Sequence, residues 1–220
     1  MTPREELAAL GSFYATPVDA VLSTHGPALD RYAEWVLGRD AFSLVTLGDV
    51  DTLCALGSTT AAARLRSAAA RWPTAIAGIK LDPAGLDDPT LYLRALCPWQ
   101  DGIDWLACEV GAVANQIPTT RTLYGFGFQG EFVKTYALAP DGFISYRIAG
   151  NSLCLEHKDY SADIAWDAIE WPDARWSAIG ALGRSLGFRN AGHVGRASET
   201  HALKIYVECT GAIPTDRSFA

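Results

Sequence analysis

The chain has 220 residues, of which 49% are hydrophobic, and a formal net charge of −7 at pH 7. This size and composition predict a single domain, residues 1–220, with enough apolar surface for a core. An acidic balance without runs of like charge excludes the basic footprint of a nucleic-acid-binding protein. No apolar stretch is long enough to cross a bilayer. We therefore expect no nucleic-acid or membrane partner. The sequence indicates no oligomeric state.

The cysteines are odd in number, widely spaced and set in apolar runs. They are Cys54, Cys97, Cys108, Cys154 and Cys209. This pattern is typical of reduced cysteines in a cytosolic protein. The four histidines show no metal-ligand spacing, and residues 1–6 lack the following apolar core of a signal peptide. These features predict a cytoplasmic protein without a metal centre built from Cys and His.

Apolar periodicity and turn residues predict five units along the chain, each with two strands. The unit ranges are 28–57, 58–97, 101–138, 143–158 and 173–209. In the first unit, apolar residues at helical spacing predict a helix over 28–38. Two strands follow at 41–47 and 51–57, joined by a turn at Gly48-Asp49.

Helices are also expected at the start of three of the other four units, and the fourth unit lacks one. These helices are predicted at 58–72, 101–116 and 173–187. The strands of these four units are predicted at 75–81, 91–97, 121–129, 131–138, 143–148, 152–158, 191–197 and 202–209. The strand pairs have connections too short for parallel crossovers. We therefore expect an α+β fold, an antiparallel β-barrel of about ten strands with αββ repeats, helices outside and a wet lumen.

A cation and a tyrosine recur two residues apart in the strand patterns, so both point to the same side of the sheet. The pairs are Lys134 with Tyr136, Lys204 with Tyr206 and, in a looser copy, Arg94 with Tyr92. The opposite strand faces are apolar. A polar sheet face that is simply solvated, or used for dimerisation, explains the same alternation. A non-catalytic barrel that binds small molecules is a further alternative.

The repeats and the sequence Lys134-Thr135-Tyr136-Ala137, followed by Pro140, resemble the PT-barrel (ABBA) family of aromatic prenyltransferases. The resemblance covers most of the chain as architecture but only short motifs as sequence. It implies transfer of a prenyl group from an allylic isoprenoid diphosphate to an aromatic small molecule inside a barrel. The chain is shorter than is usual in the family, and the fourth unit lacks its helix. These departures imply a trimmed barrel or a different activity on a related scaffold.

The resemblance implies that cations and phenols on the inner strand faces bind the departing diphosphate. The residues expected in this role are Lys80, Arg94, Lys134, Tyr136, Arg147, Lys204 and Tyr206. No tightly bound cofactor is expected, and any Mg²⁺ would be carried with the diphosphate. The same residues on an open, solvated sheet face would have no such role.

Aromatic and acidic residues complete the implied site. Tyr92, Tyr124, Phe126 and Phe128 are candidates for an aromatic substrate wall, although core packing explains the two phenylalanines equally well. The resemblance places an acid on the first hairpin, for which Asp51 is the candidate and Asp49 the alternative, while a turn also accounts for an acid there. Glu156 and Glu208 lie on predicted polar faces and are further candidates to accept a substrate proton.

Overall fold

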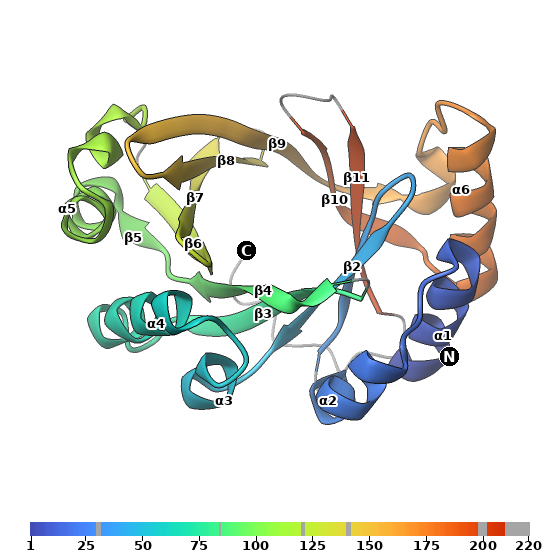
Figure 1. Ribbon diagram of the computed structural model, residues 1–220. Helices are drawn as coiled ribbons and strands as arrows, with labels where there is room; N and C mark the ends of the chain where they lie inside the picture. The colour runs from blue at the N-terminus through green and yellow to red at the C-terminus, as the bar shows by residue number, and fades with distance from the viewer. Residues whose placement is uncertain (30–31, 84, 120–121, 140–141, 198–201, 210–220) are drawn as a thin grey trace.

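The structure is a computed structural model that describes residues 1–29, 32–83, 85–119, 122–139, 142–197 and 202–209. The eleven strands found within these residues form one sheet (Figure 1). They are β1 (Glu34–Leu37), β2 (Phe42–Leu47), β3 (Ile76–Asp82), β4 (Gly85–Arg94), β5 (Cys97–Pro98), β6 (Thr122–Gln129), β7 (Phe132–Ala139), β8 (Gly142–Ala149), β9 (Ser152–Ala165), β10 (Asn190–Ala197) and β11 (Leu203–Glu208).

The strand order is β4-β3-β2-β1-β11-β10-β9-β8-β7-β6-β5, and all of the pairings are antiparallel. β4, the first strand of this order, also pairs with β6 through Leu91, Tyr92 and Leu93. The sheet therefore curves strongly enough to bring strands from its two ends together. This confirms the predicted α+β fold with an antiparallel sheet.

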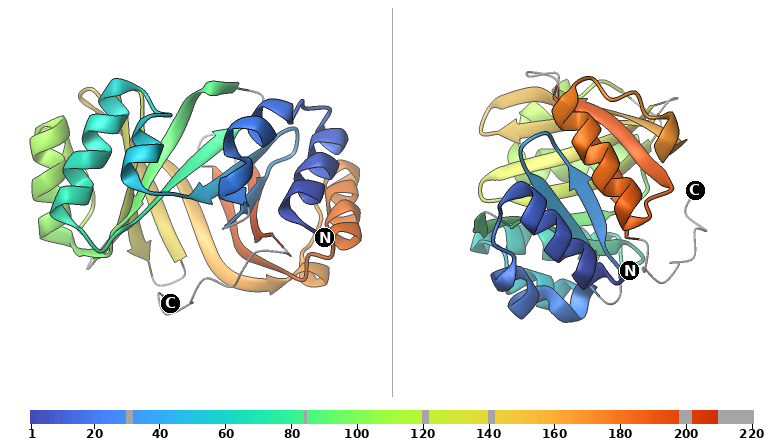
Figure 2. Two further views of the ribbon diagram at one scale, coloured as in Figure 1. Left: turned by 90° about the horizontal axis from the view of Figure 1, so that it is seen from below. Right: turned by 90° about the vertical axis from the view of Figure 1, so that its right-hand side faces the viewer.

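The helices lie on the outer side of the curved sheet (Figures 1 and 2). They are α1 (Pro3–Tyr14), α2 (Asp19–Leu29), α3 (Val50–Cys54), α4 (Thr59–Arg71), α5 (Trp99–Val110) and α6 (Ala174–Leu186), with 3₁₀ turns at Ala112–Gln116 and Trp166–Ala168. Ser58 and Asp173 cap α4 and α6 by accepting bonds from backbone N–H groups, and both helices lie within the predicted ranges 58–72 and 173–187. No helix separates β7 from β8 in the chain, which agrees with the prediction for the fourth unit.

The first unit differs from the prediction in two places. The helix expected over 28–38 is wrong, because α2 ends at Leu29 and β1 forms from Glu34. β1 is bonded on both sides, to β2 and β11, and these two ladders outweigh the helical spacing of its apolar residues. The strand expected over 51–57 is also wrong. Asp49 accepts bonds from the backbone N–H and the hydroxyl of Thr52 at 2.9 and 2.7 Å, and so starts α3.

The core lies between the outer face of the sheet and the helices. Under α4 and α5, the Phe126 ring stacks on Trp72 with centroids 5.0 Å apart and lies 4.9 Å from Trp105. Under α1, the buried Trp35 donates its indole N–H to the carboxylate of Glu6 at 2.6 Å. Apolar strand faces therefore point outward to the helices, which leaves the polar faces to the inside.

Two glycines of β6 permit close approach of the neighbouring strands. A Cβ on Gly125 would lie 2.5 Å from the carbonyl oxygen of Leu93 in β4, so a larger residue there would push the two strands apart. A Cβ on Gly127 would lie 3.2 Å from the ring of Tyr92 and 3.3 Å from the Tyr136 hydroxyl. The glycine-rich segment is thus part of a strand and makes room for side chains on the inner face.

Candidate functional site

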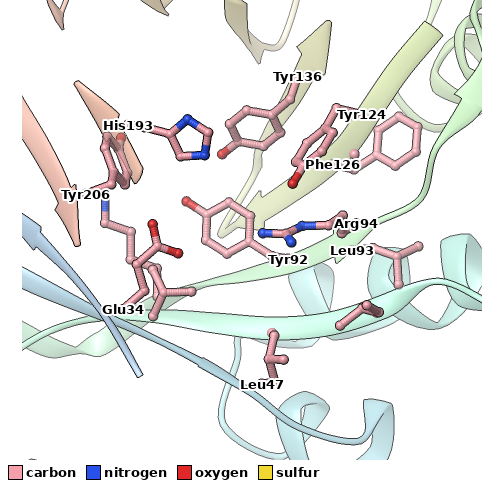
Figure 3. Close-up of a pocket in the computed structure, with 15 residues that line it drawn as sticks. Glu34, Leu47, Tyr92, Leu93, Arg94, Tyr124, Phe126, Tyr136, His193 and Tyr206 are labelled. Carbon is pink, nitrogen blue, oxygen red and sulfur yellow. The ribbon is translucent and has the colours of Figure 1, made fainter. Parts of the chain in front are cut away.

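The inner face of the sheet encloses a cavity of about 130 Å³ (Figure 3). Its lining comes from β1, β2, β3, β4, β6, β7, β10 and β11, so it lies on the axis around which the strands curve. The lining residues are Glu34, Val45, Leu47, Ile76, Gly78, Lys80, Tyr92, Leu93, Arg94, Tyr124, Gly125, Phe126, Tyr136, His193 and Tyr206. Phenols, cations and one carboxyl thus face the cavity together with aliphatic side chains.

Tyr92 and Tyr136 meet across β6, where Gly127 has no side chain to separate them. Their ring centroids are 5.8 Å apart and their hydroxyls are hydrogen-bonded. Burial raises the pKa of both phenols, so both are protonated at neutral pH. Protonated phenols can donate hydrogen bonds to an anion in the cavity.

Three lysines from β3, β7 and β11 contribute positive charge to one part of the cavity. Burial, followed by the charges of Lys204 and Lys134, lowers the pKa of Lys80 to about 7. Lys134 forms an ion pair of 2.7 Å with Glu156 of β9, and these two side chains are only 17% and 29% exposed. An anionic group placed here would be stabilised by the ammonium groups of Lys134 and Lys204 and would favour the protonated form of Lys80.

The carboxyl group that lines the cavity belongs to Glu34, a residue that was not among the predicted site residues. Its Oε2 accepts a hydrogen bond of 3.0 Å from the Tyr32 hydroxyl. Burial raises the pKa of Glu34, whereas the charges of His193 and Arg94 lower it. A carboxylate that is buried in this way is a stronger base than an exposed one. Figure 3 shows Glu34 and His193 on the same side of the cavity.

Arg94 lies at the other side of the cavity and stacks on Tyr124, with its guanidinium carbon 5.1 Å from the ring centroid. Both residues also line a second pocket of about 120 Å³, together with Trp72 and Leu96. The pair therefore forms part of the wall between the two pockets. Tyr124 points into the cavity in Figure 3, while the ring of Phe126 points away from it.

The structure brings most of the predicted polar residues to one place. Those that line the cavity are Lys80, Tyr92, Arg94, Tyr124, Tyr136 and Tyr206. The charges of Lys134 and Lys204 act on Lys80, which places both lysines near the cavity. Glu156 is near it as well, because it forms an ion pair with Lys134. Antiparallel pairing of β6 with β7 and of β10 with β11 agrees with the prediction for these segments.

Other predicted residues lie elsewhere. Asp51 is on α3, outside the sheet, with its side chain 93% exposed and 3.8 Å from Arg66, so its assignment as the acid of the first hairpin is wrong. Asp49 is the cap of α3 and is no alternative. Phe128 is fully buried, and its ring packs against Trp105 under the helices, not as a substrate wall.

The ring of Phe126 also packs under the helices, against Trp72 and Trp105. Only the backbone of this residue borders the cavity. Arg147 lies opposite Lys134 and stacks on the Phe132 ring at 3.6 Å, next to the lysine cluster but outside the cavity lining. Glu208 is exposed and lies opposite Glu34 in the β1–β11 ladder.

No protein-family model matches the chain, and no curated protein matches it at a significant level. Within the described residues, no three His, Cys, Asp or Glu side chains gather in a way that would hold a metal ion. None of the helices in that part of the chain combines the length and the apolar character needed for a membrane span. Function must therefore be inferred from the cavity itself.

Proposed function

We propose that the sheet closes as a barrel, with the β4–β6 pairing as its seam, and that its lumen transfers a prenyl group from an allylic isoprenoid diphosphate to an aromatic small molecule. The observation that carries the proposal is the cavity, in which cations and phenols from five strands converge beside aliphatic and aromatic side chains. The resemblance of Lys134-Thr135-Tyr136-Ala137 to the PT-barrel prenyltransferases points the same way.

The lysine cluster fits the diphosphate. As the allylic C–O bond breaks, the electron pair leaves with the diphosphate, which gains negative charge in the transition state. Ammonium groups and phenol donors that are already in place stabilise this charge more strongly than that of the ground state. Lys134 and Lys204 supply the charge, Lys80 adds to it when the anion favours its protonated form, and Tyr92 and Tyr136 supply the donors.

The remaining lining fits the allyl cation and the acceptor. Tyrosine rings can stabilise a cation through their faces, and Val45, Leu47 and Ile76 limit the access of water. The acceptor's aromatic carbon attacks the cation and then loses a proton. We assign the acceptance of this proton to Glu34, because its buried carboxylate is a stronger base than an exposed acid. Glu34 replaces Asp51 in the role of the acid.

The cavity volume indicates a short donor. At the 10–15 Å³ that one water requires, about 130 Å³ holds on the order of ten water molecules. Dimethylallyl diphosphate is the smallest allylic isoprenoid diphosphate and is therefore the donor to test first. Any Mg²⁺ would arrive with it, because Mg²⁺ prefers phosphate oxygens with one or two carboxylates.

The test is a product assay with dimethylallyl diphosphate and a set of phenols and naphthols, analysed by mass spectrometry. The proposal predicts a prenylated product with wild type, much less with Glu34→Gln, and an unchanged amount with Asp51→Asn. The last variant is the matched control, because Asp51 is an exposed carboxylate outside the sheet. Saturable donor binding without any product would favour the non-catalytic binder, and no donor binding would refute the proposal.

A further inference from the structure

Lys80 is an amine in the middle of β3 that faces the cavity. It lies between Val45 of β2 and Thr90 of β4 in the two ladders, and its side chain is partly buried. In the part of the chain that the structure describes, no carboxylate forms an ion pair with Lys80. An ammonium group in this position is desolvated and is not compensated by a close anion.

The charged groups around Lys80 favour its neutral form. Lys204 of β11 and Lys134 of β7 repel its positive charge, while the carboxylates of Glu156 and Glu34 attract it. Glu156 is already bonded to Lys134. Burial and the two ammonium neighbours together lower the pKa of Lys80 to about 7. At pH 7 about half of the amine is then unprotonated, compared with roughly one part in 2,500 for a lysine of ordinary pKa, 10.4.

We propose that Lys80 is a nucleophilic amine that forms an imine with a small carbonyl compound carrying a carboxylate, such as a 2-oxo acid. A lysine that is desolvated beside another cation is activated for this chemistry. The cavity gives a small molecule access to Lys80, and the ammonium groups of Lys204 and Lys134 attract the carboxylate to the same place. The inference goes beyond the proposed function and does not depend on prenyl transfer.

The step balances without a further reagent. The lone pair of the Lys80 Nζ attacks the carbonyl carbon and forms a C–N bond. The two amine hydrogens and the carbonyl oxygen leave as water, so that a C=N bond replaces the C=O bond. Protonation of the imine gives an iminium ion, which a hydride donor added in the experiment can reduce to a stable secondary amine.

The experiment uses the full chain with pyruvate and sodium cyanoborohydride at pH 7, followed by peptide mass spectrometry. The reduced adduct is expected on Lys80, at least roughly tenfold above that on Lys134 and Lys204, because Lys80 has a lowered pKa and lines the cavity. The α-amino group of Met1 is the internal reference. It is exposed, so an excess of adduct on Lys80 over that on Met1 measures the contribution of the cavity.

A second variant tests the lysine cluster. Lys204→Met removes one ammonium neighbour while keeping the length of the side chain. It should slow the labelling of Lys80 at pH 7, and circular dichroism verifies that the variant is folded. An adduct on Met1 alone, equal adducts on all lysines, or no adduct on the folded wild type would overturn the proposal. The mapping on wild type gives this answer even if the variant fails to fold.

Discussion

The ion pair between Lys134 and Glu156 gives a prediction that separates a contribution to stability from a contribution to function. Lys134→Met deletes the charge, keeps the length of the side chain, and leaves Glu156 without its partner. Breaking a fully buried pair costs about 3–5 kcal/mol, whereas exposed pairs contribute about 0–1 kcal/mol. These side chains are 17% and 29% exposed, so we expect an intermediate loss, about 1–3 kcal/mol of unfolding free energy.

At about 2–4 °C per kcal/mol for a chain of this size, the loss corresponds to a decrease in Tm of roughly 2–12 °C. The assay is a double-mutant cycle by calorimetry with Lys134→Met, Glu156→Gln and the double variant. The double variant should lose less unfolding free energy than the two single variants lose in sum, and the difference, the coupling energy, should be about 1 kcal/mol or more. Additive losses within about 0.5 kcal/mol would refute the pairing of Lys134 with Glu156 in solution.

The same cycle has a functional readout. If Lys134 stabilises the departing diphosphate, Lys134→Met should lower the single-turnover rate of prenyl transfer by roughly 30- to 1,000-fold, equivalent to about 2–4 kcal/mol. The double variant should recover stability but not this rate, because removing Glu156 does not restore the positive charge. Recovery of the rate in the double variant would show that Lys134 acts only through the fold.

Three further predictions concern the cavity and its wall. Because burial raises the pKa of Glu34, the folded state binds the proton of this carboxyl more tightly than the unfolded chain does. Wild type should therefore lose stability relative to Glu34→Gln as the pH rises above about 4.3, and the Tm values of the two proteins should not diverge in this way at lower pH. The pKa of Lys80 is lowered, so the unfolded chain binds more protons between about pH 7 and 10.4; wild type should become more stable relative to Lys80→Met as pH rises through this range, in melts at a series of pH values. Phe126→Ala should lower the free energy of unfolding, measured with denaturant, by about 3–5 kcal/mol, because Phe126 packs in the core. Tyr124→Phe should lower it far less, because Tyr124 faces the cavity, and equal losses would contradict this division.

The sequence predicts the inner faces of the regular strands well. In β4, β7 and β11, side chains alternate with period two, so the strand pattern by itself places Tyr92, Tyr136 and Tyr206 on the polar face, and all three line the cavity. The covering helices α4 and α6 were predicted closely because their apolar residues recur at helical spacing. Short-range patterns thus predicted the elements and the direction of most site residues.

Irregular positions could not be predicted in the same way. The register between β6 and β7 shifts between Leu123 and Gly125, so Tyr124 faces the cavity while Phe126 and Phe128 face the helices, against the strict alternation of the sequence. A bulge of this kind depends on the neighbouring strands and leaves little local signal.

Glu34 was missed for a related reason. The segment around it has apolar residues at helical spacing, and only its pairing with β2 and β11 makes it a strand. Glu34 itself pairs with Val45 of β2 and with Glu208 of β11, and β11 is near the end of the chain. The alternation of the polar Tyr32 and Glu34 with the apolar Ala33 and Trp35 is the signal that could have identified it.

The most direct test of the central claim, that the cationic cavity holds an allylic diphosphate, is calorimetric titration with a slowly reacting thiolodiphosphate analogue of dimethylallyl diphosphate. Wild type is expected to bind the analogue saturably with one site per chain. Lys204→Met should bind it at least about tenfold more weakly, since a charge-assisted bond of about 1.5–3 kcal/mol is lost. Asp51→Asn should bind it like wild type. Absence of binding to wild type, or equal affinity for wild type and Lys204→Met, would contradict the claim.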